Sequence, residues 1–457
     1  MQSRLILFFP LLWLAACAVA PEYRRPEVKL PVQFGAAGGE WRVAQPGEFK
    51  LPERWWSAFA DPELDRLEDR VVIDNQSLKV AESQYRIARA SLDSASAARL
   101  PSVTAAADAS RDRSKGVTAS SFGLAASANW EIDLWGRVRN SIEAAQARAE
   151  ASADDLAAAR LSMQSLLAQT WFQLRAADQQ RQLLLNTLQA DARFLDITRS
   201  RHDAGMASGL DVAQAETKLY NDRTQLSEIE LQQAQLSNAL TTLLGGAQPQ
   251  RDAAAMLPPI PAAPALLPST LLQRRPDIAA AERLTVAANA QIGLAQTAYF
   301  PVLDLGVSAG LRSNALEQLF NAPSRVWSLG PSLAMTLFDG GARRAGVEQA
   351  RASYDQAVAS YRQTVLTAFQ EVQDNLAAAR LLQREAEEQA HTLAAARRAR
   401  EIAEAQYRAG TVNALNVISA QTLELAAERS AVDIHKRRLV ASVLLLKNAG
   451  GQIGALP

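Results

Sequence analysis

The residue with the most readily assigned chemistry is Cys17, the single cysteine of the chain. It follows Leu14-Ala15-Ala16 at the end of an apolar run that begins after Arg4, the layout of a secretory signal with a small-residue cleavage site. A thiol directly after such a site is the lipid acceptor of bacterial lipoproteins. We therefore predict a signal peptide over 1–16 and lipid attachment at Cys17, with Ala18 favouring onward export to the outer membrane. The alternative is an ordinary signal peptide with an incidental cysteine.

The other reactive side chains form no catalytic or metal-binding pattern. His202, His391 and His435 lie far apart in the sequence and none has the spacing of a ligand set. The glycine pairs lack the Lys-Ser/Thr sequel of a phosphate loop, and no nucleophile–base motif occurs. We expect no enzyme and no cofactor apart from the covalent lipid. Because 48 basic residues balance 48 acidic ones, we also expect no nucleic-acid partner.

The residues outside the leader repeat once along the chain. Gly205 and Gly410 are 205 positions apart, and a whole series of residues keeps that offset. The other pairs are Gly136 and Gly341, Glu143 and Glu348, Leu210 and Leu415, Val212 and Val417, and Gly245-Gly246 and Gly450-Gly451. This period is far longer than that of solenoid arrays, so we predict a duplicated unit, over 75–246 and 276–451.

Each repeat contains a pair of candidate membrane strands, within about 102–134 and 302–338. Between Ser121 and Leu134, apolar and polar residues alternate strictly, and Leu303 to Arg312 repeats the pattern. The fourth strand carries Trp327, Leu329, Leu333, Met335 and Leu337 on one face. Such a dyad of about ten residues is typical of an outer-membrane barrel, although a half-buried sheet has the same pattern.

Four strands cannot close a barrel, and open edges are not tolerated in lipid. If the strands lie in a membrane, the protein therefore oligomerises, with eight strands in a dimer or twelve in a trimer.

Long helices occupy most of the remaining sequence. Each repeat opens with a helix (about 75–99 and 276–299), and the stretches 137–203 and 342–408 contain no proline. A helix of that length spans about 100 Å, which indicates a coiled coil or a helical wall. Glycine turns at Gly205 and Gly410 predict helical hairpins with returning helices over about 210–244 and 414–448.

The connecting segments are richer in irregular sequence. Residues 17–74 are expected to be extended with a short helix, and 452–457 form a tail. The segment 247–275 is a linker with Pro249, Pro258, Pro259, Pro261, Pro264 and Pro268.

At this point the sequence resembles the outer-membrane factors of tripartite efflux systems, the TolC and OprM-like proteins, and in particular their NodT-type lipoprotein branch. The resemblance covers the whole mature chain and rests on motifs in a fixed order. They are Pro21, Tyr23 and Pro26; Trp55-Trp56, Phe59, Asp61-Pro62 and Leu64; Asp133-Leu134-Trp135-Gly136; Arg274-Arg275-Pro276-Asp277-Ile278 with Ala281-Glu282; Ala287-Ala288-Asn289-Ala290 with Ile292-Gly293; Phe300-Pro301; Phe338-Asp339-Gly340-Gly341; and Tyr407-Arg408-Ala409-Gly410-Thr411.

The resemblance implies a mixed α and β fold with a transmembrane β-barrel of four strands per chain and twelve per trimer. This barrel continues into a long periplasmic α-helical barrel. It implies a homotrimeric exit duct for small molecules, as in multidrug resistance, working with a periplasmic adaptor and an inner-membrane pump of the resistance–nodulation–division (RND) class. The alternative within transport is the port of a type I protein secretion system. From another class, a periplasmic adaptor or structural lipoprotein would lack the four membrane strands.

The same resemblance assigns adaptor docking and the periplasmic aperture to the hairpin tips. The residues concerned are Gly205, Met206, Ser208, Gly209, Asp211, Gly410, Thr411, Asn413, Asn416 and Ser419. Several relatives have an acidic residue where Ser419 stands here, so we hypothesise that Asn413, Asn416 and Ser419 hold a closed aperture by neutral hydrogen bonds. We expect Asp211 to cap its returning helix, and Arg274-Arg275 to have a structural role beside the helix that begins at Pro276.

Overall fold

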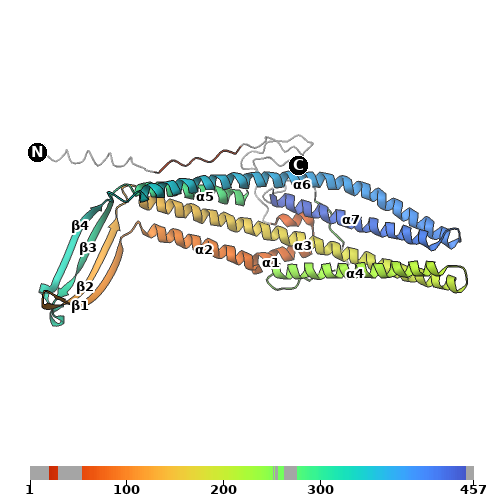
Figure 1. The fold of residues 1–457 in the computed structure, drawn as a ribbon, viewed down its shortest axis with the longest axis horizontal. Helices are drawn as coiled ribbons and strands as arrows, with labels where there is room; N and C mark the ends of the chain where they lie inside the picture. Colours follow the sequence, from red (N-terminus) through yellow and green to blue (C-terminus); the bar gives the residue numbers. More distant parts are fainter. Residues whose placement is uncertain (1–19, 29–53, 251, 253–255, 262–274, 449–457) are drawn as a thin grey trace. The chain divides into compact units, whose positions relative to one another are not determined.

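The computed structural model describes residues 20–28, 54–250, 252, 256–261 and 275–448 (Figure 1). The predicted signal peptide 1–16, the lipid attachment residue Cys17 and the tail 452–457 lie outside the described residues. So do parts of the N-terminal segment and of the Pro-rich linker.

The described chain forms two compact units, and neither coincides with one repeat. The described residues of the first, here called the strand unit, are 20–28, 82–155 and 277–364. Those of the second, the tip unit, are 54–81, 156–250, 252, 256–261, 275–276 and 365–448. Each unit combines residues of both repeats, so equivalent segments of the two repeats fold within the same unit. The predicted mixed α and β fold with four strands and an internal duplication is confirmed.

The strand unit contains one antiparallel sheet in the order β1-β2-β3-β4 (Figure 1). Its strands are β1 (Ser102–Ser114), β2 (Val117–Glu131), β3 (Val302–Ser313) and β4 (Arg325–Ala334). Strands β2 and β3 pair across the two repeats, with Leu124 opposite Leu311 and Ala128 opposite Val307. The sheet is therefore open, with β1 and β4 at its edges.

The register aligns apolar residues on one face of the sheet. Val103, Ala128, Val307 and Leu329 form one such row across all four strands, and Ala105, Ala126, Ala309 and Trp327 form the next. The opposite face is polar, with hydrogen bonds between the Thr104 and Ser127 hydroxyls (2.9 Å) and between those of Ser308 and Ser328 (2.8 Å). This is the two-faced pattern that the sequence predicted.

Strand β4 is shorter than expected. It ends at Ala334, before Met335 and Leu337, which we had placed on its apolar face. The backbone there turns toward the next helix, and the Arg343 guanidinium donates to the carbonyl oxygens of Thr336 (2.6 Å) and Leu337 (3.5 Å). These carbonyls are accordingly used by a side chain and not by the sheet.

Four helices connect to the strands at the end of the sheet opposite the strand turns. They are α2 (Gln76–Ala97) before β1, α3 (Arg137–Asp203) after β2, α5 (Pro276–Thr297) before β3 and α6 (Ala342–Arg408) after β4. Asp133 accepts hydrogen bonds from the Val138 and Arg139 amides at the start of α3. Asp339 does the same for the Gly341 and Arg343 amides at α6. A carboxylate at a helix N-terminus satisfies free amides and complements the helix dipole.

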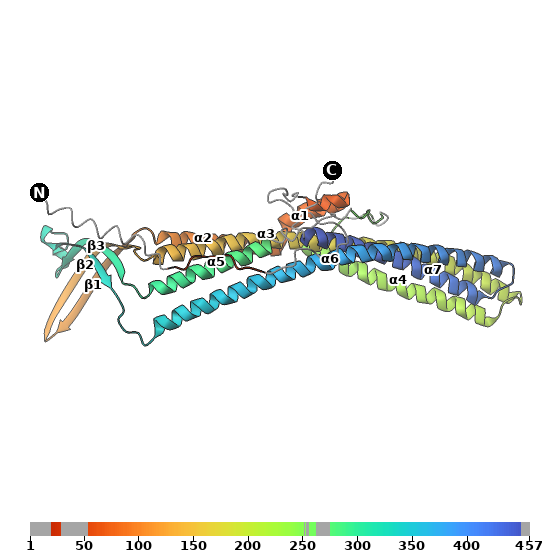
Figure 2. The ribbon, with the colours of Figure 1, turned by 90° about the horizontal axis from the view of Figure 1, so that it is seen from above.

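The tip unit is built around two helical hairpins, in which α4 (Gly209–Leu243) returns along α3 and α7 (Ala414–Asn448) returns along α6 (Figure 2). The bounds of α3, α6 and α7 coincide with the predicted ranges, and α4 begins and ends one residue earlier than expected. Within the described residues, no helix is both long and apolar enough to cross a membrane.

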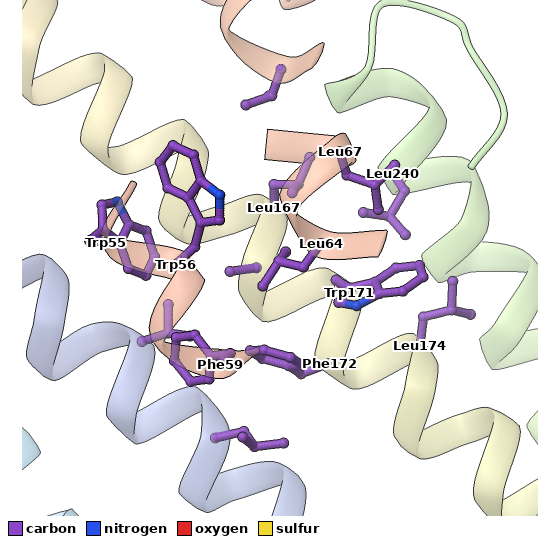
Figure 3. Close-up of a cluster of buried hydrophobic side chains, with 14 of the residues drawn as sticks. Trp55, Trp56, Phe59, Leu64, Leu67, Leu167, Trp171, Phe172, Leu174 and Leu240 are labelled. Carbon is purple, nitrogen blue, oxygen red and sulfur yellow. The ribbon is translucent and has the colours of Figure 1, made fainter. Parts of the chain in front are cut away.

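The largest core of the tip unit gathers aromatic residues from the N-terminal segment (Figure 3). Trp55, Trp56 and Phe59 lie on a short 3-10 helix, η2 (Trp55–Phe59), which precedes α1 (Pro62–Asp74). Phe59 packs against Phe172 of α3, with ring centroids 5.0 Å apart. The Trp171 indole nitrogen donates to Asp61 Oδ2 at 2.8 Å, while Asp61 Oδ1 also caps α1. The Trp-Trp and Asp-Pro motifs thus anchor the N-terminal segment to α3.

Candidate functional site

The two hairpin tips end their first helices in the same way. Gly205 and Gly410 adopt positive φ angles of 74° and 77°. At the first tip, the Met206 amide donates to the Arg201 carbonyl (2.7 Å) and the Gly205 amide donates to His202 (2.8 Å). Thr411 and Gly410 repeat both bonds at the second tip, to Gln406 and Tyr407. This is the Schellman helix end, whose left-handed position favours glycine.

The tips differ in how their returning helices begin. At the first tip, Ser208 is the N-cap of α4, and its hydroxyl accepts from the Asp211 amide at 3.2 Å. The Asp211 carboxylate returns a bond by accepting from the Ser208 amide at 2.9 Å. At the second tip, Asn413 Oδ1 accepts from the Asn416 amide at 3.3 Å, and no reciprocal bond forms in the described structure. Asp211 therefore completes a capping box around Ser208 and is not itself the cap residue.

Asp211 also connects the two tips. The Ser208 amide and hydroxyl hold the pKa of the Asp211 carboxyl below its ordinary value, and the backbone amide of Ala414 at the start of α7 adds to this effect. A carboxylate beside a second helix N-terminus is stabilised by the partial positive charge there. Asp211 of the first tip thus lies beside the start of the second returning helix.

Several tip side chains remain exposed in the single chain. Met206 and Leu210 are 71% and 66% exposed, and Leu415 of the second hairpin is 46% exposed. Thr411, Asn416 and Ser419 are exposed as well. In the described structure the side chains of Asn416 and Ser419 form no hydrogen bond with other groups of the chain.

Tyr407 joins the hairpins just behind the tips, a contact that our reading of the sequence missed. Its ring lies 5.4 Å from that of Phe194 on α3, and the Arg201 guanidinium stands 4.6 Å above it. Arg201 also donates to the Tyr407 carbonyl at 3.1 Å. One arginine therefore holds the last turn of α6 by both a hydrogen bond and a cation–π contact.

A buried charged cluster lies further along the first hairpin. Lys218 Nζ is 2.6 Å from Asp222 Oδ2 on α4 and 3.2 Å from Asp191 Oδ2 on α3, and the three side chains are between 2% and 7% exposed. Gln225 donates to the other Asp222 oxygen, and Arg429 of α7 donates to Gln225. The cluster therefore extends from the first hairpin to the second.

Burial raises the pKa of Asp191 to about 6, and the neighbouring Asp222 adds to the rise while the Lys218 ammonium opposes it. The sequence does contain a signal for this cluster. Leu184, Leu188, Asp191, Leu195 and Thr198 follow heptad spacing on α3, so a carboxylate stands at a seam position where a coiled coil places apolar residues.

Arg275, from the motif before α5, has the predicted structural setting. It is buried and its guanidinium lies 2.9 Å from Glu371 Oε2 on α6. Asp277 accepts from the Ile278 amide at the start of α5, at 3.0 Å. Arg274 is outside the described residues.

Comparisons with known proteins agree with the fold. The model of the family described as outer membrane efflux protein matches residues 69–246 and 267–451. The outer membrane protein OprJ of Pseudomonas aeruginosa is 34% identical over 465 residues, which are 96% of this chain and 94% of OprJ. The probable efflux pump outer membrane protein TtgC of Pseudomonas putida is 31% identical over 461 residues, 96% of this chain and 93% of TtgC.

The solved structure of the outer-membrane channel OprN has a TM-score of 0.87 and 29% identity, and the match covers 95% of this chain and 99% of that one. These matches define the class as a channel of the bacterial outer membrane with a helical periplasmic part. The chain belongs to the outer membrane efflux protein family, as its motifs indicated.

Proposed function

We propose that three copies of the chain form the exit duct of a tripartite pump of the RND class, which carries small molecules out of the cell. The observation that carries this proposal is the open sheet with β1 and β4 at its edges. An edge strand in lipid leaves backbone groups unpaired, so β1 of one copy must pair with β4 of the next. Three copies then contribute twelve strands.

The hairpin tips supply the docking surface in this proposal. Met206, Leu210 and Leu415 are apolar and exposed there, and the adaptor of such a system would cover them. The relative TtgC, a probable efflux pump outer membrane protein, supports an efflux pump over a protein secretion port. The polar face of the sheet suits a passive, water-filled lumen.

Cys17 has a separate part in this proposal. Its lipid would anchor the N-terminus to the membrane while the strands themselves insert. Cys17→Ser is then expected to abolish lipid labelling and leave trimers intact, whereas loss of trimers would assign the lipid a role in assembly.

A complementation experiment tests the pump assignment. The gene is expressed in one strain that lacks the outer-membrane component of an RND pump and in another that lacks the port of a type I secretion system. Restored resistance in the first strain alone supports the proposal. Restored protein export in the second strain alone would contradict it.

A further inference from the structure

The apolar face of the sheet changes character toward the strand turns. From Leu303 to Leu311, every second residue of β3 is apolar, and so are their partners on β2. This stretch is nine residues long, and a strand tilted by about 45° needs roughly 9–11 residues to cross the hydrocarbon core. The face therefore reaches the boundary of the lipid core near Leu311.

Three arginines stand on that face at and beyond the boundary. Arg325 is directly opposite Leu311, and Arg111 and Arg113 continue the row of Val103, Ala105, Ala107 and Ala109 along β1. All three side chains are exposed, and none forms an ion pair with a described residue. They are the only charged residues of the four strands on this face.

The opposite face of the same sheet is different. It carries charges of both signs, namely Asp108, Asp112, Glu131, Asp304 and Arg312. A mixed face of this kind suits water and ions. Only the outward, apolar face has charges of a single sign, and these positive charges all lie at its end near the strand turns. The turn segments themselves add one charge of each sign, Lys115 and Glu317.

The arginines belong to the two edge strands. In the closed barrel of the proposed trimer, β4 of one copy lies beside β1 of the next. Arg325 then comes next to the strand that carries Arg111 and Arg113 of the neighbouring copy, so each of the three junctions gathers three guanidinium groups. Because the helices leave the sheet at its other side and lie in the periplasm, the strand turns face the exterior.

We propose that these arginines bind the phosphate groups of lipopolysaccharide in the outer leaflet, at one site per junction between copies. Guanidinium forms paired hydrogen bonds with phosphate. Arginine on the lipid-facing side of a barrel is strongly unfavourable at mid-membrane and tolerated near the interface, which is where phosphate groups lie. This inference rests on the proposed trimer and on its orientation in the membrane.

The test uses purified trimers of the full chain in detergent, mixed with lipopolysaccharide that carries both lipid A phosphates or neither. Bound lipopolysaccharide per trimer is counted by native mass spectrometry. We expect up to three molecules to bind the wild type, with binding weakened by salt and nearly lost without the phosphates. If the wild type bound the dephosphorylated and the phosphorylated lipopolysaccharide equally well, that result alone would overturn the proposal.

The variant Arg111→Gln/Arg113→Gln/Arg325→Gln removes all three charges. Since each basic residue near an anionic lipid surface contributes about fivefold in affinity, we expect a loss on the order of a hundredfold at low salt. Arg111→Lys/Arg113→Lys/Arg325→Lys keeps the charges but loses the paired hydrogen bonds, so its affinity should lie between those of the wild type and the Gln triple variant. Arg312→Gln, on the polar face of the same sheet, is the matched control and should bind like the wild type.

Unchanged binding by the Gln triple variant, or an equal loss with Arg312→Gln, would overturn the assignment. Trimers are checked in parallel on a gel without boiling and by single-channel recording. Wild-type trimers that conduct but bind no lipopolysaccharide would refute this inference alone. Absence of wild-type trimers and channels would instead refute the proposed duct.

Discussion

The Asp211 carboxylate accepts a hydrogen bond from the Ser208 amide at 2.9 Å, and the Ser208 hydroxyl accepts one from the Asp211 amide at 3.2 Å. At the equivalent positions of the second repeat, only one bond involves a side chain, from the Asn416 amide to Asn413 Oδ1. The duplication therefore preserves the hairpin but not its start. The first returning helix is held by a reciprocal pair, and the second by a single cap bond of 3.3 Å.

Amide exchange at the two tips should reflect this difference. In the wild type, the amides of 414–417 should exchange faster than those of 209–212. The second helix start has one side-chain cap bond where the first has a reciprocal pair, so its local opening costs less free energy. Ser208→Ala should cost about 1 kcal/mol of local stability at the first tip and bring the two tips closer in exchange rate. Faster exchange at the first tip of the wild type would contradict this reading of the caps.

Leak through the closed trimer tests the role of the polar tip residues. Asn416 and Ser419 are exposed in the single chain, so any aperture contact they form is with another copy. We expect Asn416→Ala and Ser419→Ala to raise the leak conductance in planar bilayers, each removing a bond worth about 1 kcal/mol. Asn186→Ala, on α3 and away from the tips, is the control. No rise in either tip variant would remove these residues from the gate.

The contact between Arg201 and Tyr407 should also restrain the tip. Arg201→Met removes both the hydrogen bond to the Tyr407 carbonyl and the cation–π contact. We expect a higher open probability of single channels, since the last turn of α6 loses its anchor on α3. Arg408→Met, at the residue after Tyr407 in the same turn of α6, is the matched control. Equal effects of the two substitutions would mean that general charge, and not this contact, matters.

The buried cluster around Lys218 should matter for stability. Lys218→Met leaves Asp191 and Asp222 buried without their cation, which typically costs about 3–5 kcal/mol. Exchange of the amides along α3 and α4 should rise in this variant. Lys436→Met is the control because its ion pair with Asp433 is partly exposed, and its effect should stay within about 0.5 kcal/mol. A stability of Lys218→Met equal to that of the wild type would show that the cluster is not stabilising.

Asp191 should make the stability of the first hairpin depend on pH. Its pKa in the folded protein, about 6, is above the ordinary value of 3.8. The folded state therefore favours the protonated carboxyl. This contribution is fully present below pH 3.8 and is lost as the pH rises through 6. Between these limits the contribution should change by about 2–3 kcal/mol.

Asp191→Asn should remove this part of the pH dependence. Thermal dissociation of trimers is measured for both proteins between roughly pH 4 and 7.5, the range in which Asp191 of the folded protein titrates. The variant should gain stability relative to the wild type as the pH rises. A constant difference across that range would mean that Asp191 does not titrate there.

Much of the fold could be predicted because its signals are local. Proline-free stretches bounded by Gly205 and Gly410 gave the long helices and their turns, and strict alternation gave the sheet faces. The end of β4 could not be predicted, because the competing partner of its backbone is the Arg343 side chain of the next helix. Apolar residues at Met335 and Leu337 continue the alternation although the strand has ended.

The site was predicted less completely than the fold. The glycine turns located both tips, and the structure brings Asp211 beside the start of α7. The Tyr407 contact and the Lys218 cluster escaped prediction, because each joins residues of different helices whose rotation about their own axes is set by packing. The seam position of Asp191 is the one sequence signal from which the cluster could have been inferred.

Single-channel recording on the purified wild-type protein, with its oligomeric state determined by native mass spectrometry, tests the central claim most directly. We predict a trimer that inserts into planar bilayers and shows a small, mostly closed conductance. Stable monomers that insert and conduct, or trimers that never conduct, would contradict the assignment of a duct closed at its hairpin tips.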